Sequence, residues 1–483
     1  MADYTIWARN GAKNPGGNYG RLDQIQDFQK LTVDLRWGDV STWQLELPYK
    51  EFIKRWDVDP YPTETLVSDG YGLRGILIFR GGGTWATSTS DGNQVLSGVI
   101  TNASRDWNGF TDKITLTGEA DTHYMKTRVI YPHSAHTYNA SNHFWWTDTG
   151  DATHNDWAGG FGSGGVGGTS VSIEYMVRKM TDVTMGDTAA GYGAAIPAAR
   201  PLWLFSQGTI PSPATSGFGD LVRYWTRFES LYDMSVHVCG MQETVESGGY
   251  PGSTYIKRFD WDIVQLGDTG TPRLVLRFRE PTDKTDDIIF GTELGNVKSF
   301  HFEEREPEYN ALYLSGPNIW HNPATGNDQM ASDQYFMSHR GYSDSASVSK
   351  YGEVEGFTTY NIPDAPTAGT VVDMYNIEHQ MYLQARSLVA KHAYNLEGTM
   401  VLGPRECEQF MDDFHLGDVV TTSLNGLLWH DYISEIKLEV TPDGEAVTPT
   451  VCDPWKYFWS IGKTARASDI ARRNLTNLQR RLS

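Results

Sequence analysis

The stretch LGDVVTTSLNGLLWHDYISEIKLEVTPDGEAVTPTV, residues 416–451, has the pattern of a small antiparallel β unit. Apolar side chains recur at every second position in its middle, which is the period of a half-buried strand, and they are Ile436, Leu438 and Val440. Asn425-Gly426 supplies two residues that tolerate positive φ, as a tight hairpin turn requires. Pro442-Asp443-Gly444 breaks the chain again, so the stretch predicts a β meander that ends near residue 451.

A second β unit lies near the beginning of the chain. The segments LTVDLRW (31–37) and WQLELP (43–48) both alternate, and the first has a row formed by Leu31, Val33 and Leu35. They predict a hairpin. Later strands at 75–79, 95–100 and 113–120 complete one antiparallel barrel or sandwich over about 1–125.

The chain between these units has a different hydrophobic pattern. Residues 133–170 show no sustained period, which predicts a long loop. Helical spacing predicts helices over 218–232 and 371–392, and strands are expected near 254–264, 272–279 and 285–290. The predicted fold is therefore a β-rich α+β multidomain chain, in which two β-barrel-like domains flank an α+β middle region. Its parts are an N-terminal β domain (1–125), the middle region (126–300), a second β domain that includes the helix 371–392 (301–452), and a basic tail with a short helix (453–483).

Composition limits the possible functions. The chain of 483 residues is 39% hydrophobic and has 16 Trp, 25 Tyr and 19 Phe, so it should fold. Its three cysteines cannot build a disulfide framework and match no zinc module. No signal peptide and no membrane span are predicted, so synthesis in a reducing cytoplasm is expected.

Charge is distributed unevenly. The whole chain carries −20, while residues 462–483 contain six basic residues and one acidic residue, a net +5. The remaining −25 argues against wrapping nucleic acid, which requires lysine and arginine on the surface. An acidic body nevertheless suits a protein past which DNA slides without sticking.

Four stretches invite an enzymatic or ligand-binding interpretation, and each has a simpler one. The glycine-rich segment 162–169 lacks the lysine of a phosphate-binding loop, because Gly168 stands there. Loop histidines 133, 136, 143 and 154 have no metal-ligand spacing. EEREPE (303–308) could hold a glycosidase carboxylate pair, but such residues more often form a charged strand edge. The aromatic run 144–146 could stack on sugar or serve as core. We therefore assign no catalytic, cofactor-binding or metal-binding residue and expect no cofactor.

Two longer segments carry a family resemblance. DDIIFGTELGNVKSFHFEEREPEYNALYLSG (286–316) and the later FHLGDVVTTSLNG to TPTV (414–451) resemble minor tail proteins of siphoviruses of actinobacteria, which are tail-tip, or baseplate, hub proteins. The order STWQLELP, LSGVI, ITLTGEADTHYMKTRVI in the first β unit is similar too, so the resemblance covers about 20–452. The loop 133–170, the segment 200–217 and the basic tail depart from it.

The resemblance implies a structural, non-catalytic protein of the virion at the distal end of the phage tail. It implies a homotrimer that matches a sixfold tail tube to a threefold tip and lets DNA pass without specific binding. The expected partners are distal tail and tail tube proteins, the tape measure protein, and tail fibre or receptor-binding proteins. The alternatives from other classes are a cell-wall or polysaccharide hydrolase and a sugar-binding module of the tail.

Overall fold

The structure is a computed structural model of the whole chain. It describes residues 4–11, 21–56, 58, 65–68, 73–81, 83, 85, 92–130, 171–186, 205–209, 211, 217–222, 230–240, 242, 245–247, 249, 254–267, 273–322, 327–330, 337–359, 381–382, 384–386, 388–389, 392, 395–402 and 409–453. The predicted loop 133–170 and the basic tail from 454 onward lie outside these residues.

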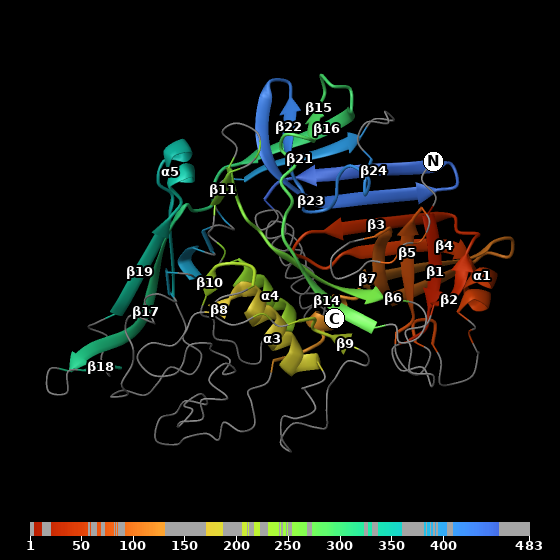
Figure 1. Cartoon of the computed structure of the whole chain (residues 1–483), viewed down its shortest axis with the longest axis horizontal. Coiled ribbons are helices and arrows are strands. Elements are labelled where there is room, and N and C mark those ends of the chain that lie inside the picture. The colour runs from red at the N-terminus through yellow and green to blue at the C-terminus, as the bar shows by residue number, and fades with distance from the viewer. Residues whose placement is uncertain are drawn as a thin grey trace, which may run out of the picture.

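A 13-stranded sheet dominates the molecule (Figure 1). Eleven of its strands follow one another in the hydrogen-bonded order β16 (Val297–Arg305), β21 (Asn395–Leu402), β24 (Gly444–Val451), β23 (Leu427–Thr441), β3 (Lys30–Arg36), β4 (Thr42–Pro48), β7 (Asp112–Ala120), β6 (Gln94–Trp107), β5 (Gly75–Arg80), β1 (Tyr4–Arg9) and β2 (Arg21–Ile25). β22 (Val419–Leu424) pairs with β23, and β15 (Ile289–Gly291) pairs with β22. Among the described strands the order has two ends, β16 and β2, and no pairing closes it into a barrel.

The two β units seen in the sequence are joined within this sheet. β23 pairs antiparallel with β3, and Figure 1 shows the blue and red halves side by side at this pair. The two apolar rows face each other in register: Ile436 opposite Leu35, Leu438 opposite Val33, and Val440 opposite Leu31. Because cross-strand neighbours on one face pack together, the rows form a continuous hydrophobic seam between the halves.

Local sequence explains the hairpins on either side of this seam. β3 and β4 form the predicted hairpin, with alternating buried and half-buried side chains. Asn425 and Gly426 connect β22 to β23 with φ of 52° and 84°, which confirms the predicted two-residue turn. The helix α1 (Tyr49–Arg55) follows β4 directly and packs Phe52 into the same core.

The middle region has its own core. The helices α3 (Ile173–Met185) and α4 (Leu231–Cys239) each begin at a serine N-cap and pack against the hairpin of β13 (Asp260–Leu266) and β14 (Arg273–Arg279). Shorter elements complete it: α2 (His123–Lys126), β8 (Val171–Ser172) paired with β10 (Leu221–Val222), β9 (Phe205–Ser206) beside β14, and β11 (Val245–Ser247) paired with β12 (Thr254–Ile256).

Two local predictions in this region need correction. The helix predicted over 218–232 is wrong, because residues 221–222 form β10 and α4 begins only at Leu231. Pairing with β8 overrides the helical spacing of the apolar residues there. The strand expected near 254–264 is two strands, β12 and β13, with Lys257–Phe259 between them.

A separate four-stranded sheet projects at the left of Figure 1. It consists of β17 (Ala311–Asn322), β18 (Asn327–Met330), β19 (Met337–Ser343) and β20 (Glu355–Thr359), with α5 (Ser345–Tyr351) between β19 and β20. The described residues between 381 and 392 are helical, which confirms that part of the predicted helix 371–392. They pack Met381, Ala385 and Val389 against Leu312 and Leu314 of β17.

In the part of the chain that the structure describes, no helix is long and apolar enough to cross a membrane. The fold is mostly β-sheet with few helices. The domain boundaries given above stay predictions.

Candidate functional site

Three segments from distant parts of the chain meet at a junction, which we call the three-way junction. It consists of the turn 37–41 after β3, the β13–β14 hairpin with the residues 257–259 before it, and the segment of β23 around Tyr432. The Trp37 indole N–H donates to the Arg258 carbonyl (3.2 Å), and the Arg258 backbone N–H donates to the Tyr432 hydroxyl (2.8 Å). The N-terminal strands, the C-terminal strands and the middle region thus meet through hydrogen bonds among buried groups.

A charge ladder lies on one side of this junction. On the β13–β14 hairpin, Asp260 is opposite Arg279 and Asp262 is opposite Arg277. The Arg277 guanidinium donates to both Asp262 oxygens, with the Nε–Oδ1 distance at 2.9 Å, and Arg279 donates to Asp260. Asp260 also accepts from the Gly38 backbone N–H at 2.8 Å. Two-oxygen pairing with arginine fixes the geometry as well as the charge.

The ladder sets the protonation of its carboxyl groups. Burial raises the pKa of Asp260, although Arg279 opposes the shift. Burial would also raise the pKa of Asp262, but the Arg277 and Arg279 guanidiniums hold it below its usual range. Asp262 is therefore a fixed negative charge at neutral pH, and its role is to hold two arginines in place.

A second, fully buried network ties the main sheet to β13. Arg9 of β1 and Asp121 have no exposed surface, and they form a two-point ion pair with distances of 2.7 and 2.8 Å. The Ser97 hydroxyl donates to Asp121 (2.6 Å) and accepts from the Gln265 backbone N–H (3.0 Å). Arg9 also donates to the Gln265 side chain and the Gly98 carbonyl, so the charge is well solvated by protein groups.

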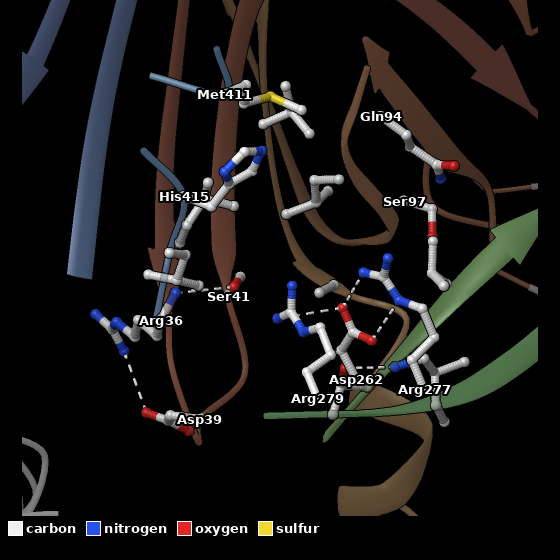
Figure 2. A pocket seen from close by; sticks show the side chains of 18 of the residues that line it. Arg36, Asp39, Ser41, Gln94, Ser97, Asp262, Arg277, Arg279, Met411 and His415 are labelled. Carbon is white, nitrogen blue, oxygen red and sulfur yellow. Dashed lines mark hydrogen bonds and ion pairs between the residues drawn. The ribbon is translucent and has the colours of Figure 1, made fainter. Parts of the chain in front are cut away.

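A pocket of about 70 Å³ lies between these two networks. Figure 2 shows Asp262 between Arg277 and Arg279 on one side and Arg36, Met411 and His415 on the other. The pocket is thus charged toward β14, and its opposite side is mixed, because Met411 lies there beside Arg36 and His415. It lies where the sheet halves and the middle region come together.

The chemistry of the junction is that of a structural clamp. Its acids are engaged by arginines, and burial raises the pKa of the Cys239 and Cys452 thiols well above the ordinary value, which disfavours the reactive thiolate. Among the described residues, no group of three or more histidine, cysteine or acidic side chains is arranged to hold a metal ion.

The carboxylates of the EEREPE stretch lie at a strand edge. Glu303 and Glu304 belong to β16, which is an end strand of the main sheet in the described order. Arg305 lowers the pKa of Glu303, and hydrogen bonds from Tyr351 and Lys350 lower that of Glu304. A general acid needs a raised pKa, so these two side chains fit the charged-edge interpretation better than the glycosidase one.

Glu308 of the same stretch contacts the His392 ring at 2.7 Å. The glycine-rich segment 162–169, histidines 133, 136, 143 and 154, and the aromatic run 144–146 lie outside the described residues.

Hydrophobic periodicity did not predict the charge ladder, although the sequence contains a signal for it. In DWD (260–262) and RFR (277–279) the charges alternate with an aromatic residue, which puts like charges on one face of each strand. Two antiparallel strands with opposite charges at the same spacing favour pairing in register. The Arg9–Asp121 pair has no such local signal.

Comparison with known proteins gives one family match. The family model of siphovirus ReqiPepy6 Gp37-like proteins matches residues 210–452, and no curated protein matches the chain. Similar solved structures include the 43 kDa tail protein of prophage MuSo2 from Shewanella oneidensis (10% identity, 94% of this chain and 99% of that chain covered, TM-score 0.46). A tail protein from Neisseria meningitidis MC58 has 8% identity, coverages of 93% and 96%, and a TM-score of 0.44. Prophage tail protein gp18 from Listeria monocytogenes EGD-e has 12% identity, coverages of 97% and 99%, and a TM-score of 0.40.

The family model includes both segments that carry the resemblance seen in the sequence, 286–316 and 414–451. The match spans half of the 483 residues. On this basis, the chain belongs to the family of siphovirus ReqiPepy6 Gp37-like proteins.

Proposed function

We propose that this protein is the structural tail-tip hub of a long-tailed bacteriophage, located at the distal end of the virion tail. It forms a homotrimer, joins a sixfold tail tube to a threefold tip, and anchors host-adhesion proteins. DNA passes through its channel without specific binding. Its neighbours are distal tail and tail tube proteins, the tape measure protein, and tail fibre or receptor-binding proteins.

The observation that carries this proposal is the β3–β23 pair. It places the N-terminal and C-terminal β units side by side in one sheet, held by six cross-strand residue pairs. A chain with two adjacent β units supplies six such units from three copies, which is the number that a sixfold tube requires. The three-way junction supports the proposal because it fixes the middle region to both units.

The ends of the main sheet suggest how the copies meet. In the described order, β2 and β16 are the outer strands, so each has one edge without a described partner strand. An interface that joins the β2 side of one copy to the β16 side of the next is heterologous, and such interfaces form rings when the rotation closes. With three copies the ring has threefold symmetry.

Labelling of virions tests the location. Antibody–gold conjugates against this protein should decorate the distal end of the tail and nothing else. Label on the capsid or along the whole tube would end the proposal.

A structure of the assembled tip tests the mechanism. The β units 1–125 and 301–452 should superpose in strand order and share one ring around a channel wide enough for DNA, with the 133–290 region outside it. Units that differ in topology or lie in separate rings would remove the basis for symmetry matching.

An assay with host cell wall or capsule separates the hub from a hydrolase. Purified protein should release neither reducing ends nor muropeptides above background. Release that disappears in a Glu304→Gln variant would favour the hydrolase.

A further inference from the structure

The outer sheet of β17, β19 and β20 has two faces of different character. Leu312 and Leu314 of β17 point to the inner face, where the helical residues 381–389 cover them. The opposite face presents Tyr313, which is 46% exposed, and Phe357, which is 71% exposed. These are large apolar side chains that the described residues leave uncovered, on a sheet that projects from the body (Figure 1).

The two aromatic residues form one row across the sheet. Tyr313 pairs with Phe357 of β20 on one side and with Gly341 of β19 on the other. Residues paired in register point to the same face, and adjacent strands lie about 4.8 Å apart. Tyr313 and Phe357 are therefore neighbours in strand register and project from the same face of the sheet.

Gly341 has a specific place under the tyrosine. A Cβ atom added to Gly341 would lie 2.9 Å from Cδ1 and 3.2 Å from Cε1 of the Tyr313 ring. Real Cβ atoms do not approach carbon atoms this closely, so the ring occupies the space that a side chain would fill. Tyr313 consequently rests against β19, while nearly half of its surface stays exposed.

Polar side chains lie in the two rows that flank the aromatic row, two residues before it and two residues after it along β17. The row on one side is Ser343, Ala311 and Glu355, in which the serine and the glutamate are exposed. The row on the other side includes the exposed Thr359 and the buried Ser315, whose hydroxyl donates to Thr359 at 3.3 Å. Aromatic faces bordered by hydroxyl and carboxylate groups can stack on the C–H face of a sugar ring while accepting and donating hydrogen bonds to its hydroxyls.

The area of this surface favours a sugar chain over a protein as its binding partner. A stable protein interface buries roughly 800 Å² on each partner. Two aromatic side chains bury about 150–250 Å² each, so together they provide roughly 300–500 Å², which is below that area. A polysaccharide can bind through a contact of this smaller size. Its sugar units repeat, so one polysaccharide chain can bind several copies of the protein at once, and the weak contacts add up.

We propose that Tyr313 and Phe357 form a platform that binds an extended, uncharged, β-linked polysaccharide of the bacterial cell surface. A β-linked chain presents flat pyranose faces on which aromatic rings can stack. The net charge of −20 and the exposed Glu355 disfavour an anionic polymer. This binding is additional to the proposed structural role and needs no catalytic group.

Binding of the full-length protein to insoluble cellulose and chitin tests the platform, with amylose as the α-linked comparison. The wild type should bind one or both β-linked polymers in depletion isotherms and should not bind amylose. Phe357→Ala and Tyr313→Ala should each weaken binding about tenfold, since each removes one stacking ring. Gly341→Ala should also weaken it, although it removes no contacting group, because the new methyl group displaces the Tyr313 ring.

Trp107→Ala is the matched control, because Trp107 is 70% exposed and lies far from this sheet, on β6. It should bind like the wild type, and thermal melting should show that all variants are folded. Binding to neither polymer, equal binding to amylose, or an equal loss in Trp107→Ala would overturn the proposal. Self-association of the chain that is weakened by Phe357→Ala would assign this face to a protein interface instead.

Discussion

At the scale of single residues, Arg9 and Asp121 form an ion pair in which both side chains are completely buried. Arg9 also donates to the Gly98 carbonyl of β6 and the Gln265 side chain of β13, and Asp121 accepts from the Ser97 hydroxyl of β6. Removal of one partner leaves the other as an uncompensated charge in a medium that solvates it poorly. The pair therefore makes the position of β13 against the main sheet sensitive to a single substitution.

We expect Asp121→Asn and Arg9→Met each to lower the free energy of unfolding by about 3–5 kcal/mol. The double variant Arg9→Met/Asp121→Asn should lose less than the sum of the two, because no unpaired charge remains. Urea unfolding of the three variants measures this. Arg105→Ala, which breaks the exposed Arg105–Asp112 pair, should change stability little. Additive losses in the cycle would show that the pair is not coupled.

His430 gives a pH dependence whose direction can be worked out. Burial lowers the pKa of His430, and Thr421 donates its only hydroxyl proton to the Thr285 carbonyl, so it accepts from Nδ1–H of the ring. The unfolded chain, with the usual value of 6.5, binds the proton more readily than the folded chain. Stability contributed by this group is therefore present above that value and is lost as the pH falls through it.

His430→Gln should reduce the loss of stability between pH 7.5 and 5.5, since glutamine cannot take up the proton but can still donate to Thr421. Urea midpoints at several pH values compare the two proteins. An identical pH slope for wild type and variant would contradict the assignment.

At the scale of elements, the approach of β22 to the turn after β3 depends on one glycine. Gly417 has φ of 88°, and a Cβ there would lie 2.0 Å from the Trp37 ring. The Trp37 ring therefore packs directly against the backbone at Gly417, where no side chain of residue 417 intervenes. Trp37 is only 2% exposed and cannot move away easily.

Gly417→Ala should lower the free energy of unfolding by about 2–4 kcal/mol, from a left-handed backbone and a steric clash together. Gly426→Ala is the control, because Gly426 has φ of 84° and no atom lies within 4 Å of the place that a methyl group would take. Gly426→Ala should lower the free energy of unfolding by only about 1–2 kcal/mol, which is the cost of the left-handed backbone conformation for an alanine. Chemical denaturation compares them. Equal losses would show that the contact with Trp37 is relaxed by small movements.

Sequence patterns predict the local hairpin and turn correctly but not the pairings between distant segments. Alternation was enough for the β3–β4 hairpin, and Asn425-Gly426 was enough for the turn between β22 and β23, because both signals are local. The helix predicted over 218–232 failed because two residues pair with a distant strand. The β3–β23 partnership and the Arg9–Asp121 pair could not be predicted, since neither apolar rows nor single charges specify which distant segment they meet.

At the scale of the whole molecule, the charge contrast between body and tail leads to a prediction from sequence alone. Residues 462–483 carry +5, while the rest of the chain carries −25. Opposite charge steers association and is screened by salt. We therefore expect this segment to dock on an acidic neighbouring surface.

Deletion of 462–483 should leave the folded body intact but weaken tail assembly. The defect relative to the wild type should be largest at low salt, because salt screens the attraction that only the wild type has. Circular dichroism checks the fold, and counting of complete tails in lysates at several salt concentrations checks assembly. A lysine-to-glutamine and arginine-to-glutamine version of the segment separates charge from chain length. Normal assembly of the deletion protein would show that the segment is dispensable.

The pairing of β3 with β23 also affects how the chain is made. The two strands are about 400 residues apart, so at about 5–20 residues per second a ribosome finishes β23 roughly 20–80 s after β3. During that interval the emerging chain contains a β3 edge whose final neighbour does not yet exist. Such an edge can pair with the same edge of another nascent chain. Translation speed and early chaperone binding therefore influence how much of this protein reaches its native sheet.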